Sequence, residues 1–110
     1  MIALSGSARI FFFRQPVDMR KGIEKLSQLV ESNCSGELMS GAYFVFVNQT
    51  KDRMKVLYWD SDGFAIWWKR LEKGSFRLLG IDKFLIDRKE FFMLLEGITP
   101  EKVQNRFSLR

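Results

Sequence analysis

The sequence predicts an α+β fold, in which an antiparallel sheet of about four to five strands packs with two helices. Three observations predict it: an alternating strand pattern over residues 53–59, a continuous apolar run over residues 43–47, and a helical apolar stripe over residues 19–30. A chain of 110 residues can build one modest core. We therefore expect a single domain over residues 1–98 and a polar C-terminal tail over residues 99–110.

The first predicted elements are a short strand and a helix. Residues 9–13 suggest a strand that is apolar on both faces, and Pro16 breaks the chain after it. Asp18 is the expected N-cap of the helix. The apolar residues that follow are spaced by three or four and form one stripe: Met19, Ile23, Leu26, Leu29 and Val30. Residues 33–41 contain Gly and Ser and predict the loop that ends this helix.

A meander of strands is predicted next. The continuous apolarity of residues 43–47 favours a central position in the sheet. Residues 53–59 alternate, so that Met54, Val56 and Tyr58 lie on one face and Arg53, Lys55, Leu57 and Trp59 lie on the other. A returning strand over residues 64–71 and a further short strand over residues 75–79 complete the expected sheet.

The second helix is expected near the C-terminus. Asp87 is a plausible N-cap in front of Arg88-Lys89-Glu90. Phe91, Leu94 and Leu95 form its core stripe, and Gly97 is a natural stop for the helix.

Two registers are open for the hairpin between residues 53–59 and 64–71. In a two-residue turn at Asp62-Gly63, Gly63 would adopt the positive φ, Lys55 would face Arg70, and Arg53 would face Glu72. A four-residue turn over residues 60–63 would instead place Lys55 opposite Trp68. Both registers leave Arg53, Lys55 and Arg70 on one face, which is the main candidate functional surface.

Composition excludes several classes of site. The single cysteine, Cys34, allows no internal disulfide, and no histidine is available for the usual zinc sets or as a general base. Apolar runs are too short to cross a bilayer, and Arg9 and Arg14 bracket the first of them, which argues against a signal peptide. We therefore predict no cofactor, no metal site and no membrane association, with the cytoplasm as the expected location.

Positive charge is the main functional signal from composition. The formal net charge is +5, a balance that is typical of nucleic-acid partners but can also simply provide solubility. Residues 51–77 hold seven Lys and Arg against four Asp and Glu, and three Trp residues lie among them. Basic groups would neutralise phosphates and an exposed Trp would stack on bases. The densest basic set is Arg53, Lys55, Lys69, Arg70, Lys73 and Arg77.

The tryptophans also suggest a partner interface. Adjacent strand residues face opposite ways, so one of Trp67 and Trp68 must look away from the layer that the other enters. We expect burial of Trp59 and of at least one of that pair. If no element of this chain covers the sheet face to which the second tryptophan points, we expect a partner protein to cover it. Trp67 and Trp68 are therefore candidate interface residues.

Two acidic patterns have a structural and a functional interpretation. Asp60 and Asp62 resemble a carboxylate pair for metal-dependent chemistry, but such residues are routine before a hairpin Gly, and the turn is favoured. Near Asp18, a helix start with Arg20 and Lys21 could hold a phosphate, although the carboxylate there would oppose an anion. Helix capping is the favoured role of Asp18, and Arg20 and Lys21 remain candidate nucleic-acid contacts.

Motifs along nearly the whole chain resemble the transposase accessory proteins of the insertion-sequence-66 family, the TnpB-type proteins encoded by the second reading frame of that element. The block around Tyr-Trp-Asp-x-Asp-Gly with Lys-Arg-Leu-Glu is the most specific. In order, the matching segments are residues 18–22 (Asp-Met-Arg-Lys-Gly), 44–48, 53–60, 62–63, 69–74, 76 and 94–98. Residues 77–86 and 99–110 depart from the family pattern, and nothing specific is carried over to them.

The resemblance implies an accessory role in transposition beside a separate transposase, with no catalytic residue in this chain. Two hypotheses follow. In the first, the basic and aromatic sheet face contacts transposon DNA and helps to assemble the transposition complex. In the second, the exposed aromatic face binds the transposase or another accessory subunit without direct DNA contact. A second copy of the chain is a further candidate partner, and an enzyme is the least favoured interpretation.

Overall fold

The computed structural model describes residues 6–78 and 84–95 and contains one five-stranded sheet with two helices. The predicted α+β class is confirmed. The sheet order is β4-β3-β2-β1-β5, so the strand predicted to be central, β2, is central. In chain order the elements are β1 (Ile10–Phe13), α1 (Ile23–Asn33), β2 (Tyr43–Val47), β3 (Arg53–Asp60), β4 (Gly63–Arg70), β5 (Leu85–Ile86) and α2 (Arg88–Leu95).

One pair of strands departs from the expected antiparallel pattern. β1 and β2 run parallel, with Ile10 opposite Tyr43, whereas the other three pairs are antiparallel. A parallel pair needs a long crossover, and α1 with its flanking loops provides it. This crossover places α1 against one face of the sheet.

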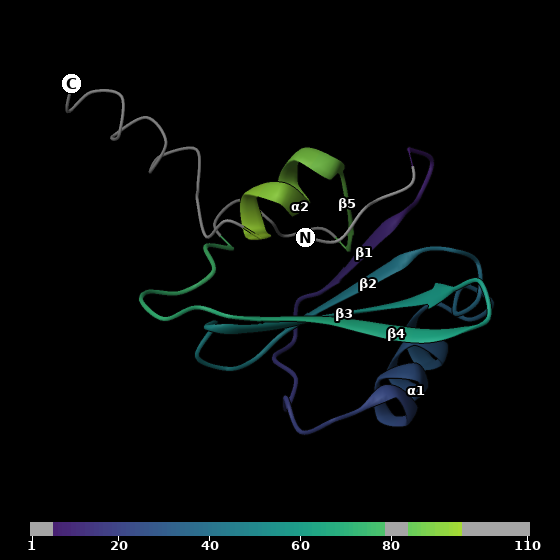
Figure 1. Cartoon of the computed structure of the whole chain (residues 1–110), viewed down its shortest axis with the longest axis horizontal. Helices are drawn as coiled ribbons and strands as arrows, with labels where there is room; N and C mark the ends of the chain where they lie inside the picture. Colours follow the sequence, from purple (N-terminus) through teal and green to yellow (C-terminus); the bar gives the residue numbers. More distant parts are fainter. Residues whose placement is uncertain (1–5, 79–83, 96–110) are drawn as a thin grey trace.

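The two helices cover opposite faces of the sheet (Figure 1). On one face, Leu26 and Val30 of α1 pack against Phe44 and Phe46 of β2 and Leu57 of β3, and residues of β1 complete this core. The opposite face meets α2, whose buried residues are the three predicted for its stripe: Phe91, Leu94 and Leu95. All five residues of β2 are buried, because its side chains enter both cores in alternation.

The start of α1 corrects the prediction for Asp18. The helix begins at Ile23, and its N-cap is Gly22, without a side-chain cap. The Asp18 carboxylate accepts a hydrogen bond from the backbone N–H of Arg20 at 2.8 Å, and the Asp18 carbonyl accepts one from Lys21 at 3.0 Å. Asp18 therefore closes a separate turn before the helix, since Asp bonds readily to backbone groups two residues ahead.

The N-cap predicted for α2 is confirmed. The Asp87 carboxylate accepts a bond from the backbone N–H of Glu90 at 2.7 Å, and the Glu90 carboxylate accepts one from the N–H of Asp87 at 3.0 Å. These reciprocal bonds form a capping box. The predicted stop at Gly97 and the tail over residues 99–110 lie outside the described residues.

The β3–β4 hairpin adopts the second of the two predicted registers. Asp60 pairs with Gly63, Lys55 lies opposite Trp68, and Arg53 lies opposite Arg70. The pairing of Arg53 with Glu72, which belongs to the first register, is therefore not formed. The positive φ of the turn falls at Ser61, with φ of 59°, and not at Gly63, which begins β4.

The strand predicted over residues 75–79 is not formed in its described part, residues 75–78. Instead, the chain is held beside the turn that precedes β3, because Phe76 is buried and its N–H donates to the carbonyl of Lys51 at 2.6 Å. The fifth strand is β5, which pairs with β1 and was not predicted. Only two residues long, it is too short to give a periodic signal.

Replacement of Ser61 tests the hairpin turn. A non-glycine residue in the left-handed region carries a cost that glycine avoids, so Ser61→Gly is expected to raise the free energy of unfolding by about 0.5–1 kcal/mol. Urea denaturation measures it. Ser35→Gly is the control, since Ser35 is exposed and has no positive φ, and it is expected to be neutral or destabilising. Equal effects of the two changes would contradict the assigned turn.

Candidate nucleic-acid interface

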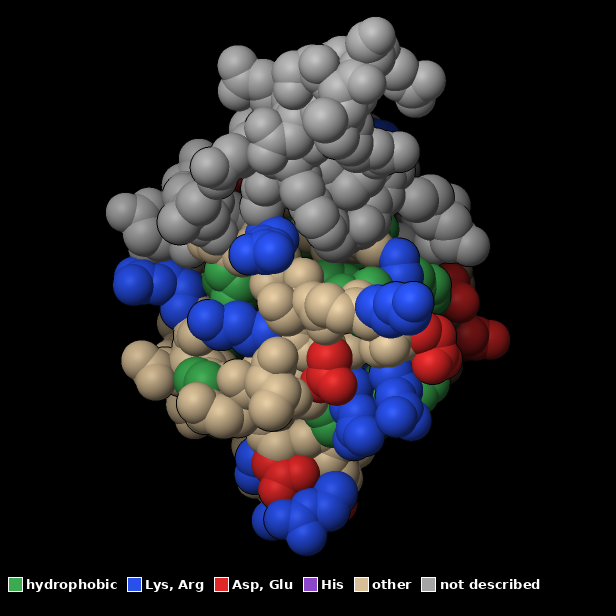
Figure 2. Space-filling view, turned by 90° about the vertical axis from the view of Figure 1, so that its left-hand side faces the viewer, with side chains coloured by type: hydrophobic (Ala, Val, Ile, Leu, Met, Phe, Trp, Pro, Cys, Tyr) green, Lys and Arg blue, Asp and Glu red, His purple; other side chains and the backbone are tan. Residues whose placement is uncertain are grey.

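A groove with a volume of about 570 Å³ lies at the end of the sheet where β2 ends, β3 begins and β4 ends. Its walls are the loop over residues 16–20 and the turn over residues 48–50, and Arg53 and Trp68 contribute from the sheet. Figure 2 views this end of the molecule and shows Lys and Arg side chains gathered on it, with fewer carboxylates among them. We call this feature the Arg53 groove.

Arg53 and Arg70 form a like-charged pair beside the groove. They are directly opposite each other on β3 and β4 and share the face that carries α1. Opposed like charges on a sheet are destabilising. Among the described residues, neither arginine has a carboxylate within 4 Å, and the Arg53 Nε is buried without a hydrogen-bond partner. This arrangement leaves donors unused for an anion.

The turn before β3 fixes the position of Arg53. The Asn48 side-chain oxygen accepts bonds from the backbone N–H groups of Asp52 and Arg53, at 3.0 and 3.1 Å. Asn48 and Thr50 in turn donate to the Asp52 carboxylate at 2.8 and 2.7 Å. These hydrogen bonds hold the pKa of Asp52 below its usual value.

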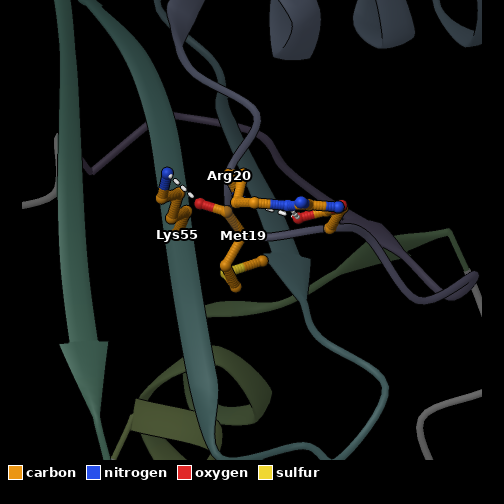
Figure 3. A network of polar contacts seen from close by, with 4 residues as sticks. Met19, Arg20 and Lys55 are labelled. Carbon is orange, nitrogen blue, oxygen red and sulfur yellow. Dashed lines mark hydrogen bonds and ion pairs between the residues drawn. The ribbon is translucent and has the colours of Figure 1, made fainter.

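Lys55 connects the sheet to the loop that forms the groove wall (Figure 3). Its ammonium donates to the carbonyl of Met19 at 2.7 Å and to the carbonyl of Lys21 at 2.9 Å. Two of its three donors are therefore used inside the protein. The predicted contact of Lys55 with nucleic acid stays a prediction, whereas its part in shaping the groove follows from these bonds.

Arg20 lines the groove but is paired with Asp18. Its guanidinium meets both carboxylate oxygens, with the shortest distance 2.6 Å, and its side chain is 91% exposed. The pairing lowers the pKa of Asp18 and raises the pKa of Arg20. Because Asp18 offsets the charge of Arg20, Arg53 is the cation of the groove lining that has no salt bridge among the described residues, although its charge also helps to lower the pKa of the neighbouring Asp52.

The remaining predicted contacts are divided between locations. Lys69 lies on the α2 face, where its ammonium donates to the carbonyl of Leu95. Lys73 and Arg77 are exposed in the segment after β4. Lys21 is half-buried in the loop before α1 and borders a second hollow, beside α1. The structure thus brings together Arg53, Lys55, Trp68, Arg70 and Arg20, and separates the other four basic residues from them.

The three tryptophans occupy different environments. Trp59 is partly buried and meets Phe64 edge-on, with ring centroids 4.9 Å apart. Trp67 packs against the α2 core, while Trp68 points to the α1 face with 52% of its surface exposed. The expected burial of Trp59 and of one member of the adjacent pair therefore holds in part, since Trp59 and Trp67 are only partly covered.

The acidic pair and the cysteine do not join this groove. Asp60 and Asp62 lie in the hairpin at the opposite end of β3 from Arg53, and the described residues contain no group of three His, Cys, Asp or Glu that could hold a metal ion. Burial and the charges of Glu37 and Glu31 raise the pKa of the Cys34 thiol. The thiol is therefore disfavoured as a thiolate nucleophile.

Sequence reasoning missed the structural elements that hold the groove. The hydrogen bonds among the side chains of Asn48, Thr50 and Asp52 were not predicted, although Asn, Thr and Asp at this spacing are typical of side-chain-bonded turns. No local signal could have found the bonds from Lys55, because they join residues more than thirty positions apart.

Together, the fold and the groove define a small single-sheet protein whose arginine-lined surface is suited to an anionic partner. Residues 8–105 match the family of IS66 Orf2-like proteins, and the chain belongs to that family. It is also 32% identical over 108 residues to the uncharacterized protein y4jC of Sinorhizobium fredii, covering 96% of this chain and 92% of the relative. No solved structure matches the chain.

Family membership confirms the resemblance noted in the sequence and assigns the chain an accessory role in transposition of an IS66-type element. Within the part of the chain that the structure describes, no helix is long and apolar enough to span a bilayer.

Removal of the Lys55 ammonium tests its structural role. Lys55→Met keeps the apolar stem but leaves two part-buried carbonyl groups without their charged donor, so the free energy of unfolding is expected to fall by about 2 kcal/mol. The control Lys25→Met removes an exposed ammonium on α1 and is expected to change stability by less than about 0.5 kcal/mol. Urea denaturation compares the two. Equal small effects would show that Lys55 does not hold the loop.

Acidification tests the contribution of two carboxylates near the groove, those of Asp18 and Asp52, to stability. Their folded-state pKa values are lowered, so the unfolded chain binds protons at a higher pH than the folded one. Their stabilisation is full above the unfolded pKa, about 3.9, and is lost as the pH falls through the folded values. Urea midpoints measured downward from pH 7 are expected to decline less steeply for the double variant Asp18→Asn, Asp52→Asn than for the wild type. Parallel profiles would contradict the assignment.

Proposed function

We propose that the chain contacts the DNA of its element through the Arg53 groove and Arg70, and so assists a separate transposase. Membership of a transposon-encoded family makes DNA and the transposase the natural partners. The observation that carries the proposal is the opposed pair Arg53 and Arg70, in which the buried Arg53 Nε has no partner among the described residues.

An anionic partner explains this pair in energetic terms. Two opposed arginines repel each other in the free protein, and a buried donor without an acceptor costs free energy. A phosphate beside them would relieve the repulsion, since guanidinium groups bind phosphate oxygens with charge-assisted hydrogen bonds. Backbone phosphates occur at every nucleotide, so such contacts position the protein without requiring a particular sequence.

The surroundings of the pair support nucleic acid over an isolated small anion. The chain has a formal net charge of +5, and basic side chains gather around this end of the sheet (Figure 2). Lys73 and Arg77 are exposed in the segment that follows β4 and add to the positive charge outside the pair. A charge distribution larger than one small anion fits a polyanion.

The test is binding of the purified protein to labelled duplex DNA from the element ends, measured by anisotropy across salt concentrations. Phosphate contacts release counterions, so affinity is expected to fall steeply with salt. Arg53→Gln and Arg70→Gln are each expected to reduce the slope of log affinity against log salt by about 0.9. Lys89→Gln is the matched control, because it removes one exposed charge from α2 on the opposite face and should leave the slope nearly unchanged.

A charge reversal separates loss of binding from loss of folding. Arg70→Glu places a carboxylate opposite Arg53, so it is expected to raise the free energy of unfolding by about 0.5 kcal/mol while weakening DNA binding. A more stable variant that binds poorly cannot be explained by misfolding. If the folded wild type binds no DNA at low salt, this function is wrong, and the Arg53 groove becomes a candidate contact for an acidic surface of the transposase.

A further inference from the structure

Trp68 occupies an unusual place in the sheet. It is 52% exposed and borders the Arg53 groove, whereas its neighbour Trp67 packs into the α2 core. Alternation along β4 forces the two rings to opposite faces. Exposure of so much indole surface to water is unfavourable.

The cover provided by α1 stops short of Trp68. Ile66 and Phe64, on the same face of β4, pack against the core that contains Leu26 and Val30 of α1. The last part of β4 instead faces the groove, whose outer wall is the loop over residues 16–20. That loop is held in place by the bonds from Lys55 to Met19 and Lys21. The ring of Trp68 therefore forms one side of the Arg53 groove, and the loop held by Lys55 forms its outer wall.

The other side of the groove offers phosphate contacts and a polar edge. Arg53 lies two residues along β3 from Lys55, which is directly opposite Trp68, so the guanidinium and the indole border the same space. Gln49 is exposed in the turn that lines the groove and carries an amide able to bond with a base edge. Asn48 cannot do so, because both ends of its amide are already bonded within the turn.

This combination matches an unpaired nucleotide better than a duplex. Bases within a duplex are stacked on one another and expose only their edges in the grooves, so an indole has no ring face to meet. An unpaired nucleotide carries both a free ring face and a phosphate. The groove has a volume of about 570 Å³, which leaves room for one nucleotide.

We propose that the Arg53 groove takes one unpaired nucleotide of DNA, with its base stacked on Trp68 and an adjacent phosphate bound by Arg53 and Arg70. This inference rests on the proposed function and specifies which form of DNA the surface selects. The protein then prefers single-stranded or locally opened DNA over an intact duplex.

The test compares a labelled oligo(dT) of about 15 nucleotides with a duplex of the same length, by anisotropy at matched salt. The wild type is expected to bind the single strand more tightly. Trp68→Ala is expected to weaken single-strand binding by about tenfold, within the range for loss of one base stack, with little effect on the duplex. Trp68→Phe keeps a ring and should retain most of the affinity.

Two controls make the result specific. Leu85→Ala removes a side chain of similar exposure, 49%, from the strand at the other edge of the sheet, and should change neither affinity. Salt dependence separates the two contacts, since Trp68→Ala should lower affinity at every salt concentration without changing the slope, while Arg53→Gln changes the slope. Circular dichroism and urea denaturation of each variant verify folding.

The outcomes distinguish this inference from the proposed function. Equal binding of duplex and single strand, or a Trp68→Ala variant that loses affinity equally for both, overturns the inference and leaves DNA contact intact. A single-strand preference that survives Trp68→Ala also overturns it. If the folded protein binds neither the single strand nor the duplex at low salt, the proposed function itself is wrong.

Discussion

β2 buries every one of its side chains, and the architecture depends on that constraint. A strand of five buried residues cannot face water on either side, so the sheet needs a cover on both faces. The crossover from β1 to β2 supplies α1 for one face, and the segment after β4 supplies α2 for the other. On the α1 face, the Arg53 groove forms at the end of the sheet where β3 begins, and a loop, not the helix, is its outer wall.

The cations at this end differ in what they already bind, and that difference matters more than their number. Lys55 has two carbonyl partners, Lys69 has one at the end of α2, and Arg20 has a carboxylate. Each of these groups gives much of its bonding capacity to the fold. Arg53 and Arg70 have no ion-pair partner among the described residues, so they keep the capacity that an anionic partner would use.

Local sequence patterns were sufficient to predict the fold class, the central strand and the two faces of β3, because each of these depends on residues that are neighbours in the chain. For the same reason, the sequence predicted Asp87 as the N-cap of α2, although it did not predict the return bond from Glu90 that completes the capping box. The parallel pairing of β1 with β2 could not be read from residues 9–13, since apolar runs carry no direction. The candidate site was located only in part: the pattern of β3 and β4 identified Arg53, Arg70 and Trp68 as surface candidates, but the internal partners of Lys55 and Lys69 depend on tertiary contacts.

The hairpin register is the link between local conformation and function. In the alternative register Arg53 would face Glu72, and a cross-strand ion pair would neutralise it. The observed register depends on Ser61 adopting a positive φ, so that Asp60 pairs with Gly63 and the strands continue with Arg53 opposite Arg70. The same shift places Trp68 opposite Lys55, the residue that anchors the groove wall. Both registers keep the two arginines and the indole on one face, but only the observed register leaves Arg53 without a carboxylate opposite it. The turn residue Ser61 thus determines whether Arg53 keeps the unused donors that the proposed contact with an unpaired nucleotide requires.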